Sequence, residues 1–267
     1  CTFTGNTAGI GGGGVYNEGN VENMSDCVFT NNKADYGGGV INYSNVTSTN
    51  GCTFAGNTAG IGGGGVYNDG NVENMSDCAF TNNTADYGGG GIYNTGTFTS
   101  FHGNNFTSNF AVLESGGAIN SQLATTTFRL KSSFFMKNSA AINGGAIAGP
   151  ANSYTEGRGP DAFVSTPAVD VEGCTFENNV CSAYGGAVSG KDVRITSSDF
   201  TNNNASTGGA VYSQSQFGGN GSNHFTRNSA HDAGGAIFID TIANWTWPSN
   251  GSFANNSAGC CYDASYN

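Results

Sequence analysis

Short apolar stretches of three to five residues alternate with turn-forming residues along the whole chain. Residues 27–30, 39–41 and 45–47 are examples, and Gly, Asn, Ser and Thr separate them. β-Branched and aromatic residues between such breakers are typical of short strands. No stretch of ten residues carries an apolar stripe with a helical period, and Leu occurs only three times. The pattern therefore predicts an all-β protein and disfavours helices and leucine-rich repeats.

These stretches recur with a fixed period. A Phe with an Asn three residues later recurs ten times in step, and in nine of these repeats Gly-Gly followed by Val or Ile lies about a dozen residues after the Phe. Successive Phe residues are 24 to 29 residues apart, except for one gap of 41. Residues 1–39 return as residues 52–90 with four differences. A period of about 25 residues is the signature of a solenoid. The repeated Phe residues are Phe3, Phe29, Phe54, Phe80, Phe106, Phe135, Phe176, Phe200, Phe225 and Phe253.

Three short strands and three turns fill one period of this length. We therefore predict a right-handed parallel β-helix of about ten rungs with three short strands per rung, the hand being the one that parallel crossovers prefer. Residues 1–267 are expected to form a single domain with an insertion loop at 148–173, where the long gap falls. The Phe residues and the Val or Ile residues should stack in two interior files. The Asn of each repeat should hold a turn, by tolerating the left-handed conformation and bonding to its own backbone or to the next Asn.

The combination of Phe-x-x-Asn with Gly-Gly-Ala-Ile or Gly-Gly-Ala-Val resembles the repeat pair of the chlamydial polymorphic outer-membrane proteins and related adhesin-like β-helix proteins. The motif pair is clearest in residues 135–147, 200–211 and 225–237. In residues 1–92 another Gly replaces the Ala, or the Ala is lost. The resemblance covers nearly the whole chain and implies a surface-exposed adhesive or structural protein.

Only 10% of the residues are charged, against about 25% in an average soluble protein. We expect attached sugar to supply the missing solubility, because Asn-x-Ser/Thr sequons are frequent. An Asn-, Ser- and Thr-rich chain also generates some sequons by chance. The sequence therefore predicts a secreted, extracellular or cell-surface glycoprotein with covalent N-glycans. The eleven candidate sites are Asn23, Asn42, Asn45, Asn74, Asn82, Asn105, Asn204, Asn220, Asn244, Asn250 and Asn255.

All eight cysteines are disulfide candidates. Five of them stand two residues before a repeated Phe and form one file, and each could be a free thiol that fills the core. Neighbouring rungs could also be bridged, such as Cys1 to Cys27 or Cys52 to Cys78, because the rung spacing lies within the Cα separation that a disulfide tolerates. The connectivity stays undetermined. No Cys-x-x-Cys or Cys-His spacing indicates a metal site. The eight are Cys1, Cys27, Cys52, Cys78, Cys174, Cys181, Cys260 and Cys261.

The net charge of −11 argues against nucleic acid or an anionic membrane as a partner. No run of 18 apolar residues occurs, so we expect no direct membrane insertion.

Parallel β-helices also occur among polysaccharide lyases and hydrolases, whose chemistry requires carboxylates gathered in one groove. Here Asp26 recurs as Asp77 and Asp35 recurs as Asp86, but both pairs are copies made by the duplication. Solvated turn residues explain them better than a weak calcium site does. The three His residues are scattered and have no ligand or triad spacing. We therefore predict that the chain is not an enzyme and has no catalytic residue, metal or cofactor.

The insertion between residues 148 and 173 is the one place where the repeat is interrupted. Long excursions from a scaffold often carry binding residues, so this loop is a candidate contact site, with an ordinary surface loop as the alternative. Its candidate residues are Tyr154, Glu156, Arg158 and Asp161.

The chain starts without Met and both ends fall in mid-pattern without a capping element. This suggests a processed or partial chain, and uncapped solenoid ends favour head-to-tail assembly of the chain with itself. The first hypothesis is a secreted structural glycoprotein that forms an extracellular filament or a cell-surface coat. The alternative is a cell-surface adhesin stalk that binds glycans or host surfaces. A polysaccharide lyase or hydrolase ranks third.

Overall fold

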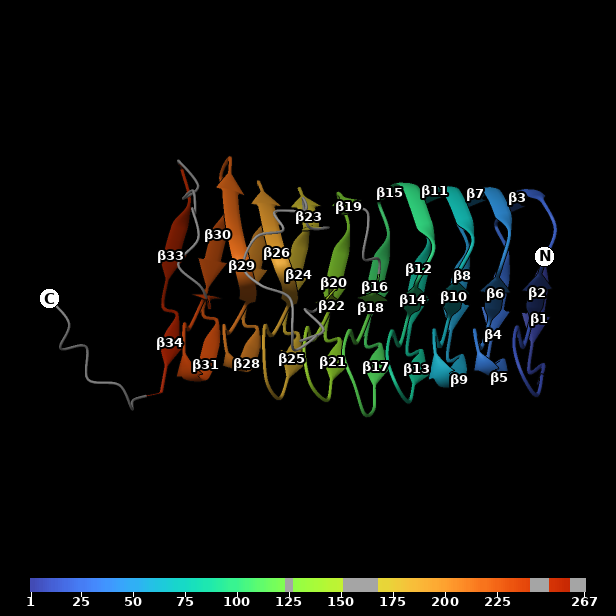
Figure 1. Ribbon diagram of the computed structural model, residues 1–267, viewed down its shortest axis with the longest axis horizontal. Helices are drawn as coiled ribbons and strands as arrows, with labels where there is room; N and C mark the ends of the chain where they lie inside the picture. Colours follow the sequence, from blue (N-terminus) through green and yellow to red (C-terminus); the bar gives the residue numbers. More distant parts are fainter. Residues whose placement is uncertain (123–126, 151–167, 241–249, 260–267) are drawn as a thin grey trace, which may run out of the picture.

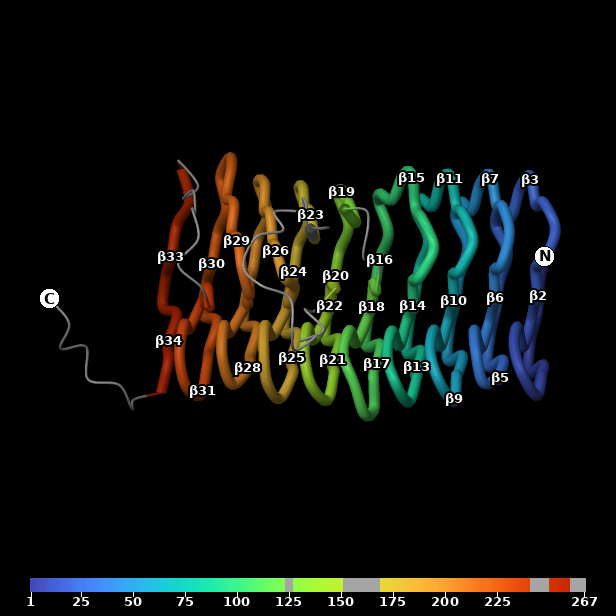
Figure 2. The backbone as a smooth tube through the Cα atoms, in the orientation of Figure 1, coloured from blue at the N-terminus to red at the C-terminus, as the bar shows by residue number. Residues whose placement is uncertain are grey.

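The computed structural model describes residues 1–122, 127–150, 168–240 and 250–259. In these residues the chain winds into stacked coils, about nine in number, and contains strands but no helix (Figure 1). Every strand pairing is parallel, and the strands form three sheets along the length of the coil. The tube in Figure 2 follows the coils from the blue N-terminal end to the red C-terminal end. The predicted parallel β-helix is confirmed.

The first sheet contains ten strands, each with a repeated Phe at its centre. They are β1 (Thr2–Thr4), β4 (Val28–Thr30), β8 (Thr53–Ala55), β12 (Ala79–Thr81), β16 (Asn105–Thr107), β20 (Phe134–Met136), β24 (Thr175–Glu177), β27 (Asp199–Thr201), β30 (His224–Thr226) and β33 (Ser252–Ala254).

The second sheet contains nine short strands that follow the ladder Asn. They are β5 (Lys33–Tyr36), β9 (Thr58–Gly62), β13 (Thr84–Ala85), β17 (Phe110–Ala111), β21 (Ser139–Ala140), β25 (Val180–Cys181), β28 (Asn204–Thr207), β31 (Ser229–Ala233) and β34 (Ser257–Ala258).

The third sheet has two limbs, which β26 and β29 join because each of these strands runs through both. The first limb follows the Gly-Gly motif and consists of β2 (Val15–Asn17), β6 (Val40–Asn42), β10 (Val66–Asn68), β14 (Ile92–Asn94), β18 (Ile119–Ser121), β22 (Ile147–Ala148), β26 (Val188–Thr196), β29 (Val211–Asn220) and β32 (Ile237–Ile239). The second limb adds β3 (Val21–Ser25), β7 (Asn45–Asn50), β11 (Asn71–Ser76), β15 (Thr97–His102), β19 (Phe128–Lys131) and β23 (Ala168–Glu172).

The repeated Phe residues form one continuous stack inside the coil. Neighbouring rings lie 4.6 to 5.0 Å apart between centroids and within 6° of parallel. The Val and Ile residues of the third sheet pack against this stack in one core cluster. Strand partners that match residue for residue from rung to rung impose this stacking. Both predicted interior files are confirmed.

A ladder of Asn side chains borders the Phe stack. In each step the Oδ1 of one Asn accepts hydrogen bonds from the backbone N and the Nδ2 of the Asn one rung earlier, as Asn83 does from Asn57 at 3.0 Å. The Nδ2 group of Asn83 also donates to the carbonyl of Phe54 at 2.9 Å. Every polar atom of the amide therefore has protein partners. The left-handed residue of the turn is the one before the ladder Asn, such as Asn82 with φ of 53°, and not the ladder Asn itself as predicted.

A second Asn ladder, which the sequence analysis missed, lies at the corner between the two limbs of the third sheet. Asn17, Asn42, Asn68 and Asn94 are buried, and each Nδ2 donates to the Oδ1 of the next at 2.7 to 2.9 Å. Their amides also bond the backbone two residues further on, as Asn42 does at the carbonyl of Ser44. The ladder ends at Ser121. The Asn ladder at this corner is thus confined to the first four rungs.

The Asn83→Leu variant tests the first ladder. Leu cannot accept from Asn57 or donate to Phe54, so buried polar groups lose their partners and unfolding should become easier by about 3 kcal/mol. Asn105→Leu is the matched control because Asn105 is exposed on the outer face of the first sheet, where substitutions change stability by about 0.5 kcal/mol or less. Chemical denaturation of both variants, produced without glycans, measures the difference. Equal stability of the two variants would show that the ladder contributes little.

Candidate functional site: an axial groove

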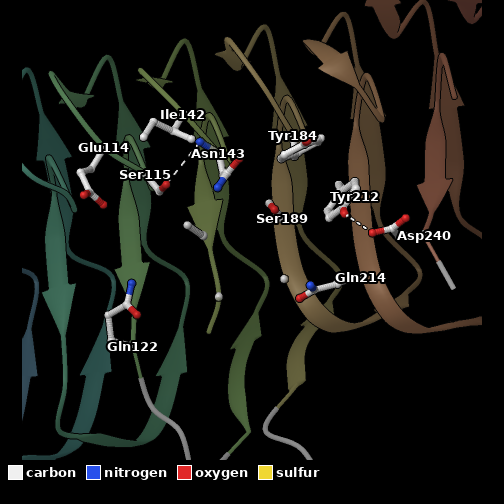
Figure 3. Close-up of a pocket in the computed structure, with 13 residues that line it drawn as sticks. Glu114, Ser115, Gln122, Ile142, Asn143, Tyr184, Ser189, Tyr212, Gln214 and Asp240 are labelled. Carbon is white, nitrogen blue, oxygen red and sulfur yellow. Dashed lines mark hydrogen bonds between the residues drawn. The ribbon is translucent and has the colours of Figure 1, made fainter. Parts of the chain in front are cut away.

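A groove runs along the outside of the first limb of the third sheet. One hollow of about 480 Å³ lies beside β18, β22, β26 and β29, and another of about 300 Å³ lies beside β10 and β14. Both hollows are lined by Glu114 and Gln122, so they form one trough parallel to the coil axis. We call this trough the axial groove. Figure 3 shows its larger hollow.

The floor of the axial groove is the outward-facing file of the first limb. The residue after each core Val or Ile points away from the core, because successive side chains of a strand alternate. In rung order the file contains Tyr67, Tyr93, Asn120, Ala148, Ser189, Tyr212 and Phe238. Large rings stand at both ends, and three small or medium side chains lie between them. The hollow therefore exists because the outward-facing side chains of three consecutive rungs are smaller than the rings on either side.

Two walls flank this floor. Glu114, Ser115, Ile142, Asn143 and Tyr184 come from the corner between the second and third sheets, and they lie on one side in Figure 3. The other side is formed where the first limb ends, and it carries Gln122, Gly149, Gly190, Gln214 and Asp240. Gln122 and Gln214 lie across the floor from Glu114 and Tyr184 in Figure 3.

The aromatic side chains of the groove support one another. Tyr36 meets Tyr67 edge to face with ring centroids 5.2 Å apart, and Tyr67 stacks on Tyr93 at 5.3 Å. At the far end Tyr184 and Tyr212 lie 4.6 Å apart. Gly62 leaves room beside Tyr93, because a Cβ on Gly62 would lie 3.0 Å from the Tyr93 ring. Aromatic rings held in place in this way lose little conformational freedom on binding a ligand.

The polar groups of the groove are mostly positioned by internal bonds. The Tyr212 hydroxyl donates to Asp240 Oδ2 at 2.8 Å, and Asn120 Nδ2 donates to the Ser115 carbonyl at 3.1 Å. The backbone N of Asn143 donates to Ser115 Oγ (Figure 3). Asn143 Oδ1 is different, because within the described residues this buried oxygen has no hydrogen-bond partner. An acceptor left in this state is rare in folded proteins.

The groove has negative charge. Its lining includes Glu114 and Asp240 but neither Lys nor Arg among the described residues. Burial, followed by the charge of Glu114, raises the pKa of Tyr93, and burial raises the pKa of Tyr67. Both phenols therefore keep their protons at neutral pH.

The two carboxylates of the groove are far apart. Glu114 and Asp240 belong to coils four rungs apart, which corresponds to about 19 Å along the axis. Glycoside hydrolysis requires a pair of carboxyl groups about 5 to 10 Å apart. These two groups are therefore suited to binding and not to acting as an acid–base pair.

The predicted acidic positions do not form a site. Asp26 and Asp77 occupy left-handed turn positions with φ of 50° and 54°, and both are exposed. Within the described part of the chain, no group of three or more His, Cys, Asp or Glu side chains could hold a metal ion. No helix there could cross a membrane.

The described cysteines all carry free thiols, and all but Cys1 are buried. In-register rungs hold equivalent Cβ atoms about 4.8 Å apart, beyond the range of about 3.5 to 4.5 Å that a disulfide prefers. This spacing favours the interpretation of the file as core filler. Cys174 and Cys181 lie in separate packed clusters and are not brought together. Cys260 and Cys261 fall outside the described residues.

Most of the predicted glycosylation sites are accessible. The prediction needs correcting at Asn42, because this residue is buried in the second ladder and its amide is hydrogen-bonded to Asn17, Ser44 and Asn68. Asn74 is half-buried and Asn244 falls outside the described residues. The loop candidates Tyr154, Glu156, Arg158 and Asp161 also fall outside them. The exposed sites are Asn23, Asn45, Asn82, Asn105, Asn204, Asn220, Asn250 and Asn255.

The fold is a parallel β-helix that carries a lateral groove. Four parts of the chain, residues 1–18, 26–44, 77–95 and 173–191, match the Chlamydia polymorphic membrane protein repeat. Each part contains one Phe-x-x-Asn motif and the following Gly-Gly motif. No curated protein and no solved structure matches the chain. The chain thus carries β-helix repeats like those of the polymorphic outer-membrane proteins, as the motifs predicted, and these repeats suggest a surface or adhesin-like protein.

The state of the thiols can be measured directly. Burial raises the pKa of Cys174 to about 11 and that of Cys181 to about 12. Since only thiolates alkylate rapidly, we expect both residues to resist iodoacetamide at pH 8 in the folded chain and to react once guanidinium unfolds it. Mass mapping without reductant should recover both peptides unlinked. Disulfide-linked peptides, for example Cys52 with Cys78, would favour the bridging alternative instead.

Proposed function

We propose that this chain is the shaft of a surface-displayed, adhesin-like protein and that the axial groove is its contact surface. The observation that carries the proposal is the axial groove, whose floor holds half-buried rings and whose wall holds Asn143 Oδ1, an acceptor without a partner among the described residues. Small-molecule and polymer sites combine apolar faces with a few positioned polar groups in this way. The repeat match to surface proteins supports the same conclusion.

The solenoid gives such a groove a stiff support. Each rung is bonded to the next through three sheets, the Phe stack and the Asn ladder. A solenoid built in this way presents an extended lateral surface whose positions are fixed relative to one another. Groove residues from several rungs can therefore act together on one long ligand.

We also propose that the exposed sequons carry the N-glycans. None of the eight exposed Asn residues lines the axial groove. Glycans at these positions would cover the outer faces of the sheets and leave the groove accessible. A head-to-tail filament stays a prediction from the sequence, and no contact among the described residues favours it over the adhesin-like function.

Filling the groove tests the proposal. In Ser189→Trp the indole would occupy the hollow between Asn120 and Tyr212, so binding of the purified chain to host-type cells should weaken about tenfold or more. Binding is measured by flow cytometry with fluorescently labelled protein. Asn105→Trp is the control because it places the same side chain on the outer face of the first sheet. Thermal unfolding confirms that both variants fold. If both variants lost cell binding equally, or if Ser189→Trp bound cells as well as the wild type does, the groove would not be the contact surface.

A further inference from the structure

The shape of the axial groove restricts its occupant to an elongated molecule. Tyr93 lines the smaller hollow and Tyr212 lines the larger one, and the two residues are separated by four rungs, or about 19 Å. The floor between them is formed by Asn120, Ala148 and Ser189. A compact ligand would reach one ring only. A linear chain lying along the coil axis reaches both rings and the polar groups between them.

The hydrogen-bonding groups of the groove call for a ligand that donates. Asn143 Oδ1 is a buried acceptor without a partner among the described residues. The carboxylates of Glu114 and Asp240 are acceptors at opposite ends of the hollow. Hydroxyl groups spaced along a chain can donate to all three. A half-buried aromatic side chain next to such acceptors suits a sugar ring, which offers C–H groups on its face and hydroxyls at its edge.

The negative charge of the groove restricts the class of ligand further. Two carboxylates without a Lys or Arg in the described lining would repel a ligand that carries carboxylate or sulfate groups. The net charge of −11 acts in the same direction. Uronic, sialylated and sulfated glycans are thereby disfavoured relative to uncharged ones.

Two other ligand classes fit less well. An extended peptide binds β-proteins by pairing with a free strand edge, but the strands beneath the groove already pair on both sides with the neighbouring rungs. A quaternary ammonium group requires rings arranged around it, whereas the larger hollow offers two rings, Tyr184 and Tyr212, that pack against each other.

We propose that the axial groove binds an uncharged linear oligosaccharide, whose sugar rings pack against the half-buried side chains of Tyr93 and Tyr212 and whose hydroxyls donate to Asn143, Glu114 and Asp240. This inference rests on the proposed function, in which the groove is the contact surface. It goes further by naming the class of ligand.

The test is isothermal titration of the full chain with neutral hexasaccharides, namely cellohexaose, maltohexaose and mannohexaose. At least one should bind, and Tyr212→Ala should weaken its Kd about tenfold or more. Tyr16→Ala is the matched control, because Tyr16 occupies the same outward file but lies outside the groove; it should leave the Kd unchanged. Hexagalacturonate and choline serve as the anionic and cationic comparators.

Asn143→Leu separates a binding role from a structural one. Removing an acceptor that has no partner in the free protein should leave the thermal stability unchanged or raise it, while oligosaccharide binding weakens about tenfold or more. A loss of stability together with unchanged binding would overturn the role given to Asn143.

The outcomes distinguish this inference from the proposed function. If Ser189→Trp abolishes cell binding but none of the three neutral hexasaccharides binds, or hexagalacturonate or choline binds instead, the ligand class is wrong and the groove keeps its contact role. If the wild-type chain binds neither cells nor any hexasaccharide, the proposed function itself fails.

Discussion

The in-register stacking of one coil on the next is the constraint on which the rest of this structure depends. The ladder amides show why. An Asn amide at the edge of the core has two donors and an acceptor that all need partners, and here an identical Asn one rung away supplies most of them. The remaining donor is satisfied by a Phe carbonyl on the earlier rung. A shift in the path of a single coil would leave both neighbours with unsatisfied buried groups. The ladder thereby keeps every coil to one path and holds the Phe stack at a nearly constant spacing.

The same constraint leaves the outward-facing residues free to vary. The interior files and the Asn ladder maintain the coil. The position after each core Val or Ile can therefore be Tyr, Asn, Ala, Ser or Phe without changing the path of the rung. The second Asn ladder holds the corner between the limbs in the first four rungs. It ends at Ser121, and the larger hollow of the groove begins in the same coil. Loss of the corner ladder and appearance of the hollow thus coincide along the chain.

The sequence was sufficient to predict what repeats. The Phe-x-x-Asn and Gly-Gly motifs indicated the period, the fold class and both interior files, because a residue that every coil needs must recur in every coil. The second Asn ladder was also visible, as an Asn two residues after Val15, Val40, Val66 and Ile92. It was missed because it stops after four coils. The left-handed turn residue was placed one position too late, since Asn, Ser, Lys, Arg and Gly all occupy it and no single residue type marks it.

The groove could not be predicted by the same reasoning, for a physical reason. Its floor exists because Asn120, Ala148 and Ser189 are smaller than the rings on either side, and these three share no motif. Only their common register shows that they are neighbours. In a solenoid the core residues therefore recur in every coil, whereas the residues of a lateral groove differ from coil to coil. Such a groove would be recognised in a sequence by changes of residue type at one outward position in consecutive coils. The interior files must stay unchanged in the same coils. The three small positions between Tyr93 and Tyr212 meet that criterion, since their interior neighbours remain Ile, Ile and Val.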